Sequence, residues 1–304
     1  PAFNPNAFID RNDDNLISSY FRDSAAPLLN RAIKGLYSPG SVFKIITMLS
    51  ALETGKISFF TSYLCNGHFF LGAHEFSCWE AHGLQDLRQA VTHSCNVYFY
   101  HLGLLVGPDL LGRLAREFGL GVPTGIDLPS ESRGLVPSRL QKKISKNEIW
   151  YNGDTVNFSI GQGDLLTTPL QMVKLMAAVI NESVNLRPHV VKKIGDKEIE
   201  YKIPTARMKM KSEFFEKARS YLRAVVSEPT GTANILDIPG LNIAGKTGTA
   251  QVGKGKSHSW FVGFLPYQKP RMAFCVFLEN GGSSYNSCVV AKEMLQAMLA
   301  QKIL

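Results

Sequence analysis

Ser41 and Lys44 are the first residues whose types and spacing could support chemistry, because a hydroxyl and an amine stand three positions apart. Apolar residues then recur at helical spacing as far as Gly55, which predicts a buried helix over residues 41–54. On that helix the lysine lies one turn beyond the serine, on the same face. A lysine whose pKa is lowered by apolar neighbours and a second cation can deprotonate a serine nucleophile. Alone, however, the pair favours a simple N-cap serine with a solvent-facing lysine.

Two further motifs change this balance. They are the sequences Ser94-Cys95-Asn96 and Lys246-Thr247-Gly248. Ser-x-x-Lys, Ser-x-Asn and Lys-Thr-Gly in this order form the signature of penicillin-binding proteins and class A β-lactamases. Three short motifs in the right order are far more specific than any one of them. We therefore interpret the chain as a serine acyltransferase.

Each motif residue has a chemical role in this interpretation. Ser41 is the nucleophile and Lys44 its base, although the base is disputed in this superfamily. The Ser94 hydroxyl can relay a proton between Lys44 and the leaving nitrogen. The Asn96 amide can hold the substrate amide, and Lys246 adds a cation that keeps Lys44 neutral and attracts the substrate carboxylate.

The third motif is predicted to form a strand that binds substrate. Thr247 supplies a hydroxyl to the substrate carboxylate. Gly248 lacks a Cβ, which lets the strand edge approach the substrate backbone. The backbone N–H groups of Ser41 and Thr249 are the candidates for an oxyanion hole.

The sequence around the motifs resembles that of class B penicillin-binding proteins over nearly the whole chain. The segments concerned are Tyr37–Ser41, Gly153–Gly163 and Ala244–Ala250. Residues 1–6 and 78–83 look like the elongation branch of that family, penicillin-binding protein 2. The resemblance implies a peptidoglycan D,D-transpeptidase that needs no cofactor for catalysis. Ser41 would attack a D-alanyl-D-alanine peptide, a stem-peptide amine would then form the cross-link, and β-lactams would acylate the same serine.

Two alternatives remain open. A serine β-lactamase needs a deacylating water, and we find no convincing Glu-x-x-x-Asn match for class A between Gly125 and Gly163. Asn96 argues against class D, which usually has a small apolar residue there. A non-catalytic β-lactam sensor or scaffold for elongation proteins is the alternative from another class.

The resemblance also implies a cellular setting. Whole family members carry a membrane anchor and a non-catalytic pedestal, so we interpret this sequence as the transpeptidase part on the periplasmic face of the bacterial inner membrane. There it would act in cell elongation, cell shape and antibiotic action, with a polymerase and a morphogenetic scaffold as partners. The net charge is +8, but the basic residues are scattered. They do not form the runs of a nucleic-acid patch.

A metal site is a further hypothesis. Cys65, Cys78 and Cys95 lie within 31 residues, with His82 among them. The spacing is not that of a standard zinc finger. Yet Ser94 and Asn96 must face the cleft, so Cys95 between them could face the rear and complete a tetrahedral zinc site. A disulfide and separate buried thiols are the alternatives.

The predicted fold is α+β, with an antiparallel sheet covered by helices and a second, mostly helical lobe. We expect a single domain over 1–304, with a lead-in at 1–35, the helical part at 36–240 and the sheet part at 241–304. Residues 57–83 are expected to be irregular, 130–149 exposed and 187–211 extended. Predicted strands are Asn242–Val252, Ser259–Leu265 and Arg271–Leu278. Predicted helices are Leu84–His93, Val97–Leu105, Asp109–Phe118, Glu213–Val226 and about Cys288–Ile303, with one more from Pro169, capped by Thr168, to about Asn181.

Overall fold

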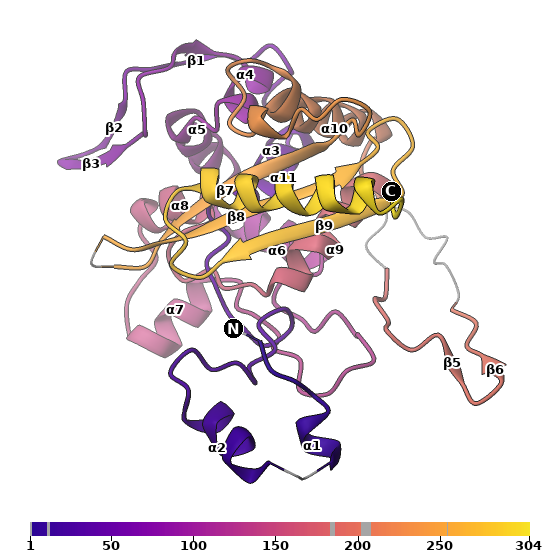
Figure 1. Ribbon diagram of the computed structural model, residues 1–304. Helices are drawn as coiled ribbons and strands as arrows, with labels where there is room; N and C mark the ends of the chain where they lie inside the picture. The colour runs from indigo at the N-terminus through magenta and orange to yellow at the C-terminus, as the bar shows by residue number, and fades with distance from the viewer. Residues whose placement is uncertain (1, 11–12, 183–185, 202–207, 254) are drawn as a thin grey trace.

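The sheet that carries the third motif lies at the centre of the molecule (Figure 1). The computed structural model describes residues 2–10, 13–182, 186–201, 208–253 and 255–304. Strands β7 (Ala244–Gln251), β8 (Ser257–Leu265) and β9 (Met272–Leu278) form an antiparallel sheet in that order. Lys246 pairs with Val262, which pairs in turn with Cys275. The three strands were predicted within two residues of these bounds.

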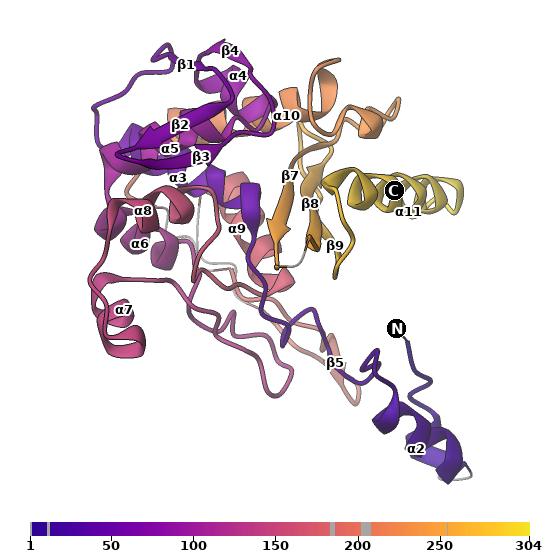
Figure 2. The same cartoon turned by 90° about the vertical axis from the view of Figure 1, so that its left-hand side faces the viewer.

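Strand β8 is buried from its second residue onward because both faces of the sheet are covered. Trp260, Phe261 and Val262 are fully buried. Helix α11 (Ser284–Ala300) packs on one face, and α9 (Pro169–Asn181) contacts β8 and β9 from the other (Figure 2). Helix α11 begins one turn before the predicted start at Cys288. The reason is its N-cap, Ser283, whose side chain accepts a hydrogen bond from the Tyr285 backbone N–H.

The helical lobe stands beside the sheet, so the predicted α+β class is confirmed. Helix α9 has its predicted limits, because Thr168 accepts from the Gln171 amide as N-cap and Pro169 takes the first position. The lobe also contains η1 (Gly40–Phe43), α3 (Lys44–Glu53), α4 (Leu87–Thr92), α5 (Asn96–Val106), α6 (Pro108–Glu117) and α8 (Asn152–Ser159). Helix α10 (Ser212–Ser227) contacts both α4 and β7, and η2 (Asn234–Leu236) contacts α10 and α11.

Residues 57–83 are not irregular, and the expected helix over Leu84–His93 is wrong in its first part. Four short strands occupy the region: β1 (Tyr63–Cys65), β2 (His68–Leu71), β3 (His74–Ser77) and β4 (Gly83–Gln85). Strand β1 pairs with β4, and β2 with β3, both antiparallel. Helix α4 starts only after Asp86, which caps it. Strands of three or four residues are too short to show a period in the sequence.

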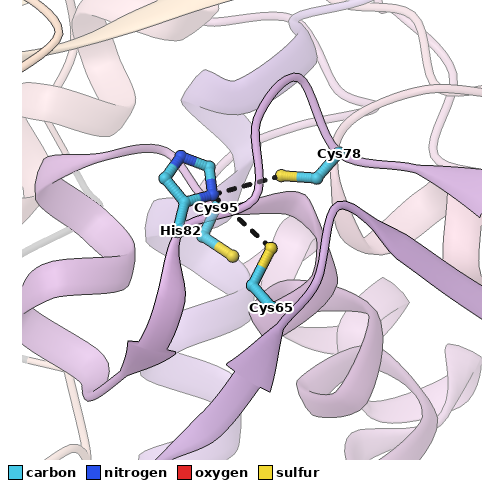
Figure 3. Close-up of side chains that lie close together, drawn as sticks. All are labelled: Cys65, Cys78, His82 and Cys95. Atoms are coloured by element: carbon cyan, nitrogen blue, oxygen red, sulfur yellow. Dashed lines mark hydrogen bonds between the residues drawn. The ribbon is translucent and has the colours of Figure 1, made fainter.

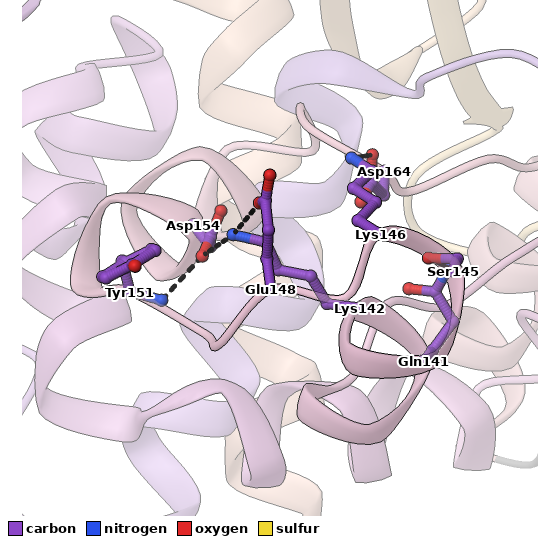
Figure 4. A network of polar contacts seen from close by, with 8 residues as sticks. All are labelled: Gln141, Lys142, Ser145, Lys146, Glu148, Tyr151, Asp154 and Asp164. Carbon is purple, nitrogen blue, oxygen red and sulfur yellow. Dashed lines mark hydrogen bonds and ion pairs between the residues drawn. The ribbon is translucent and has the colours of Figure 1, made fainter.

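The stretch 130–149 was expected to be exposed, but it contains helix α7 (Arg139–Lys146) with a buried lysine. The Lys142 ammonium lies 2.7 Å from an Asp154 oxygen and 3.3 Å from a Glu148 oxygen (Figure 4). Lys146 lies 2.7 Å from Asp164. These ion pairs attach α7 to α8 and to the loop that ends at Asp164.

Two peripheral parts extend from this body in Figure 1. Helices α1 (Ala7–Asp10) and α2 (Asp14–Arg22) lie in the lead-in. The predicted excursion contains a small hairpin of β5 (Lys193–Ile194) and β6 (Lys197–Glu198), and the predictions for 202–207 and 254 lie outside the described residues. A search of the described helices finds none long and apolar enough to span a membrane.

Candidate active site

Ser41 was predicted to open a helix over 41–54, but it lies in a tight turn that precedes the α-helix. Gly40–Phe43 is a 3₁₀ turn, and the α-helix begins only at Lys44. Side chains three positions apart eclipse one another in a 3₁₀ turn, so the serine and the lysine share a face. The lysine is 1% exposed, whereas the serine lines an open cleft. The solvent-facing lysine of the structural alternative is therefore wrong.

Two glycines allow this turn and strand β7 to lie against each other. A Cβ on Gly40, whose φ is +54°, would lie 2.5 Å from the Thr249 carbonyl oxygen. A Cβ on Gly248 would lie 2.7 Å from the Pro39 carbonyl oxygen. The space that Gly248 leaves open is thus occupied by the turn that carries Ser41. We had expected that space to face the substrate.

The Ser-x-Asn motif contacts Lys44 directly. The Lys44 ammonium donates to the Ser94 carbonyl and to Asn96 Oδ1 at 2.7 Å each, and to Ser94 Oγ at 3.3 Å. Asn96 Nδ2 in turn donates to the Ser77 carbonyl at 3.2 Å. Ser94 has a left-handed φ of +54°, which turns the chain between α4 and α5. Among the described residues, none makes a hydrogen bond to the Ser41 hydroxyl.

The third motif places a second amine beneath the cleft. Lys246 is fully buried and donates to the Thr247 carbonyl at 3.3 Å and to its hydroxyl at 3.4 Å. That hydroxyl also shares a 2.8 Å hydrogen bond with the Thr232 hydroxyl. Thr247 and Thr249 line the cleft from β7.

Burial lowers the pKa of both amines. It lowers the pKa of Lys44 to about 8, against an opposing effect of Cys78, Cys95 and Cys65. Burial, followed by the charge of Lys44, lowers the pKa of Lys246 well below its ordinary value. We had expected Lys246 to be the cation that keeps Lys44 neutral. The structure instead makes burial the main cause of the lowered pKa in both lysines.

The three motifs meet in one cleft of about 850 Å³, lined by Ser41, Ser94, Asn96, Thr247 and Thr249. Other lining residues were not predicted as site residues: Glu75, Tyr100, Gln162, Ser284 and Tyr285 are among them. They come from β3, α5, a loop and α11, and only Gln162 falls in a segment that the family resemblance singled out. The order and spacing of the short motifs were the only signal that predicted any part of this cleft.

The four predicted metal ligands lie together at the rear of this site (Figure 3). Their ligand atoms all lie within 4.8 Å of one another. His82 Nδ1 is 3.5 Å from both Cys65 Sγ and Cys78 Sγ. Tetrahedral zinc with Zn–S of about 2.3 Å and Zn–N of about 2.1 Å requires an S···N distance of about 3.6 Å. The donor set and its spacing therefore fit zinc.

The electrostatics of this cluster favour a thiolate. A hydrogen bond with Cys95 holds the pKa of Cys78 far below its ordinary value. The backbone N–H of Asn96 also donates to the Cys78 sulfur at 3.1 Å. A thiolate is the form of cysteine that binds metals. All five cysteines, each within the described residues, are free in this structure, so it contains no disulfide between them.

The sheet with its helical layers and the serine, lysine and amide groups at its edge define the class of penicillin-recognising serine proteins. The sequence matches the profile of the penicillin binding protein transpeptidase domain over residues 1–300. The chain belongs to this family.

Relatives and solved structures agree with this assignment. Peptidoglycan D,D-transpeptidase MrdA of Acinetobacter baumannii is 34% identical, over 98% of this chain and 48% of the relative. Pseudomonas aeruginosa PBP2 in complex with WCK 5153 has a TM-score of 0.88 at 32% identity, over 99% of this chain and 69% of that one. PBP2 in complex with MreC from Helicobacter pylori gives 0.85 at 32% identity, over 96% and 56%. The chain spans about half the length of the curated relatives it matches.

Proposed function

We propose that this chain is the transpeptidase domain, over 1–304, of a peptidoglycan D,D-transpeptidase. One observation carries the proposal. The Lys44 amine is buried beneath the cleft and hydrogen-bonded to both Ser94 and Asn96, in a turn that presents Ser41 to the cleft. A nucleophile, a base with a lowered pKa and a relay hydroxyl are the parts that serine acyl transfer requires.

In the first half-reaction Ser41 attacks the penultimate carbonyl of a D-alanyl-D-alanine donor. Neutral Lys44 takes the hydroxyl proton, and Ser94 passes a proton to the departing D-alanine nitrogen. The oxyanion is held by the backbone N–H groups of Ser41 and Thr249, where losing one donor typically costs about 10²–10³ in rate. Thr247 and Lys246 bind the terminal carboxylate, and Asn96 holds the substrate amide.

In the second half-reaction an acceptor amine attacks the Ser41 ester. The C–Oγ bond breaks, the new amide bond forms the cross-link, and Lys44 returns a proton to the serine. A β-lactam enters as the donor does, but its leaving group stays attached. The adduct therefore blocks the cleft, which makes this site an antibiotic target.

A mass spectrum after exposure to labelled penicillin tests the proposal. We expect a single adduct on a tryptic peptide containing Ser41, which persists for many minutes after free drug is removed. A transpeptidase has no positioned deacylating water, so the ester survives. Rapid turnover of the drug would instead identify a β-lactamase, and an unmodified Ser41 would contradict both.

We propose that Cys65, Cys78, His82 and Cys95 hold a structural zinc ion. The cluster is carried by the region of β1, β3 and β4 and by the cap of α5, which starts at Asn96. Zinc would supply four bonds that hold these short strands behind the catalytic turn, and it would take no part in proton transfer.

Elemental analysis should find about one zinc per chain, and Cys78→Ser should lose it and lower Tm by roughly 5–10 °C. The matched control is Cys275→Ser, which changes a cysteine on β9 outside the cluster and should keep the zinc. Metal-replete wild-type protein without zinc, together with a Cys65–Cys78 disulfide in the mass spectrum, would refute the zinc site.

The setting is proposed from the relatives. One similar structure is of PBP2 with MreC, which supports a morphogenetic scaffold as partner during elongation. A polymerase partner and a position on the periplasmic face of the inner membrane rest on the family resemblance. Co-purification of the full-length protein with the scaffold from a membrane fraction would test this setting.

A further inference from the structure

Glu75 is the only residue with a formal charge among the described residues that line the cleft. The chain as a whole carries a net charge of +8, and the two amines of the site lie buried beneath the cleft. The single charged group on the open wall is therefore an anion in a basic protein. It gives this wall of the cleft a negative charge.

Strand β3 fixes Glu75 relative to the catalytic groups. Two positions further on, the Ser77 carbonyl accepts hydrogen bonds from Asn96 Nδ2 at 3.2 Å and from the Tyr100 hydroxyl at 3.1 Å. Between them, Phe76 packs edge-on against the Tyr100 ring, with centroids 5.8 Å apart. Two residues of strand span about 7 Å. Glu75 is thus held near the Asn96 side chain, which accepts a hydrogen bond from Lys44.

The Glu75 carboxylate is held in place by one of its oxygens, and the other oxygen is available for a further hydrogen bond. One of its oxygens, Oε1, contacts His68 Nδ1 on the paired strand β2. The other oxygen makes no hydrogen bond to any residue in the part of the chain that the structure describes. The Glu75 side chain is 45% exposed, so a ligand in the cleft can reach it. An oriented carboxylate with a free oxygen is a site for a cation.

We propose that Glu75 binds the ammonium group of the acceptor stem peptide; this inference rests on the transpeptidase function proposed above. The donor peptide ends in a carboxylate, which Glu75 would repel and which the Thr247 hydroxyl on β7 would bind. The acceptor amine is a primary ammonium near neutral pH. The negative charge of Glu75 therefore assigns this wall of the cleft to the acceptor.

The bound ammonium group loses two protons in the course of the reaction. The first goes to solvent at the mouth of the cleft, which leaves a neutral amine. That amine attacks the Ser41 ester and the C–Oγ bond breaks. The second proton passes through the Lys44 amine to Ser41 Oγ, so the enzyme is regenerated and one proton is released. Glu75 binds and concentrates the acceptor against competing water, and forms no covalent bond.

The test measures how the acyl-enzyme partitions between an amine and water. The acyl-enzyme is formed from a thioester analogue of acyl-D-alanine, and products are separated by mass. Nα-acetyl-lysine amide presents only a side-chain ammonium, whereas hydroxylamine is an uncharged acceptor near neutral pH. Glu75→Gln should lower the aminolysis-to-hydrolysis ratio with the lysine probe about three- to fivefold, the size expected for a part-exposed ion pair. The ratio with hydroxylamine should not change.

Two further readouts exclude a merely structural role. Added salt should lower the wild-type ratio with the lysine probe but leave that of Glu75→Gln unchanged, because salt screens the ion pair. Glu216→Gln makes the same charge change on the exposed face of α10, away from the cleft, and should behave as wild type. Glu75→Asp keeps the charge and should retain part of the preference.

Three other outcomes would contradict the role of Glu75 in acceptor binding or the proposed function. An equal loss with both acceptors, or none with either, overturns the role of Glu75 while acylation by penicillin leaves the transpeptidase function intact. A wild-type protein that uses hydroxylamine but not the lysine probe also overturns it. Failure of penicillin to acylate the wild type refutes the proposed function itself.

Discussion

Ser41→Ala is expected to abolish covalent modification by labelled penicillin. Removal of a serine nucleophile that acts with its base lowers the rate on the order of 10⁶-fold, which leaves no adduct to detect. The fold should be unaffected, because the Ser41 hydroxyl makes no hydrogen bond to a described residue. A substitution away from the core typically changes the free energy of unfolding by about 0.5 kcal/mol or less. Intact-protein mass and thermal unfolding measure the two effects.

Ser284→Ala is the matched control for this variant. Ser284 also lines the cleft, from the first turn of α11, and its side-chain oxygen has no role in the proposed chemistry. The control should be acylated at close to the wild-type rate. An adduct on the Ser41→Ala protein would show that another residue is the nucleophile, and survival of a depleted strain on that variant would favour a non-catalytic scaffold.

Local signals in the sequence predicted the parts of this molecule that depend on near neighbours. Thr168 and Pro169 start α9 through contacts within four residues, so the first residue of the helix was predicted correctly. The catalytic motifs were found for a different reason. Their residue types carry chemical information that does not depend on knowing the fold, and their order along the chain excluded most coincidences.

Contacts between distant residues determine what the sequence did not reveal. Lys142 is buried because Asp154 and Glu148 lie across from it, and a run of polar residues gives no sign of that arrangement. The missing Cβ of Gly248 matters because Pro39, far away in the sequence, lies against it. Strand β3 places Glu75 on the cleft wall through hydrogen bonds to α5. No periodicity in the sequence encodes such pairs.

Lys44→Arg should lower the rate constant of acylation by penicillin about 10²–10⁴-fold, the usual contribution of a general base. Arginine keeps the positive charge but does not lose its proton in proteins. If Lys44 served only as a charge, the variant would stay active. Lys44→Met removes both charge and base and should lose acylation too, at a stability cost of about 1–3 kcal/mol for the acceptors of Ser94 and Asn96 left unpaired. Stopped-flow acylation and thermal unfolding separate these effects.

The pH dependence identifies which amine is the base. The reactive form of Lys44 is the neutral one, so wild-type acylation should rise with pH and level off above about 8, where burial has placed the pKa of Lys44. Burial and the charge of Lys44 also lower the pKa of Lys246 well below its ordinary value. If Lys44→Arg kept the wild-type rise, Lys44 would not be the group that titrates.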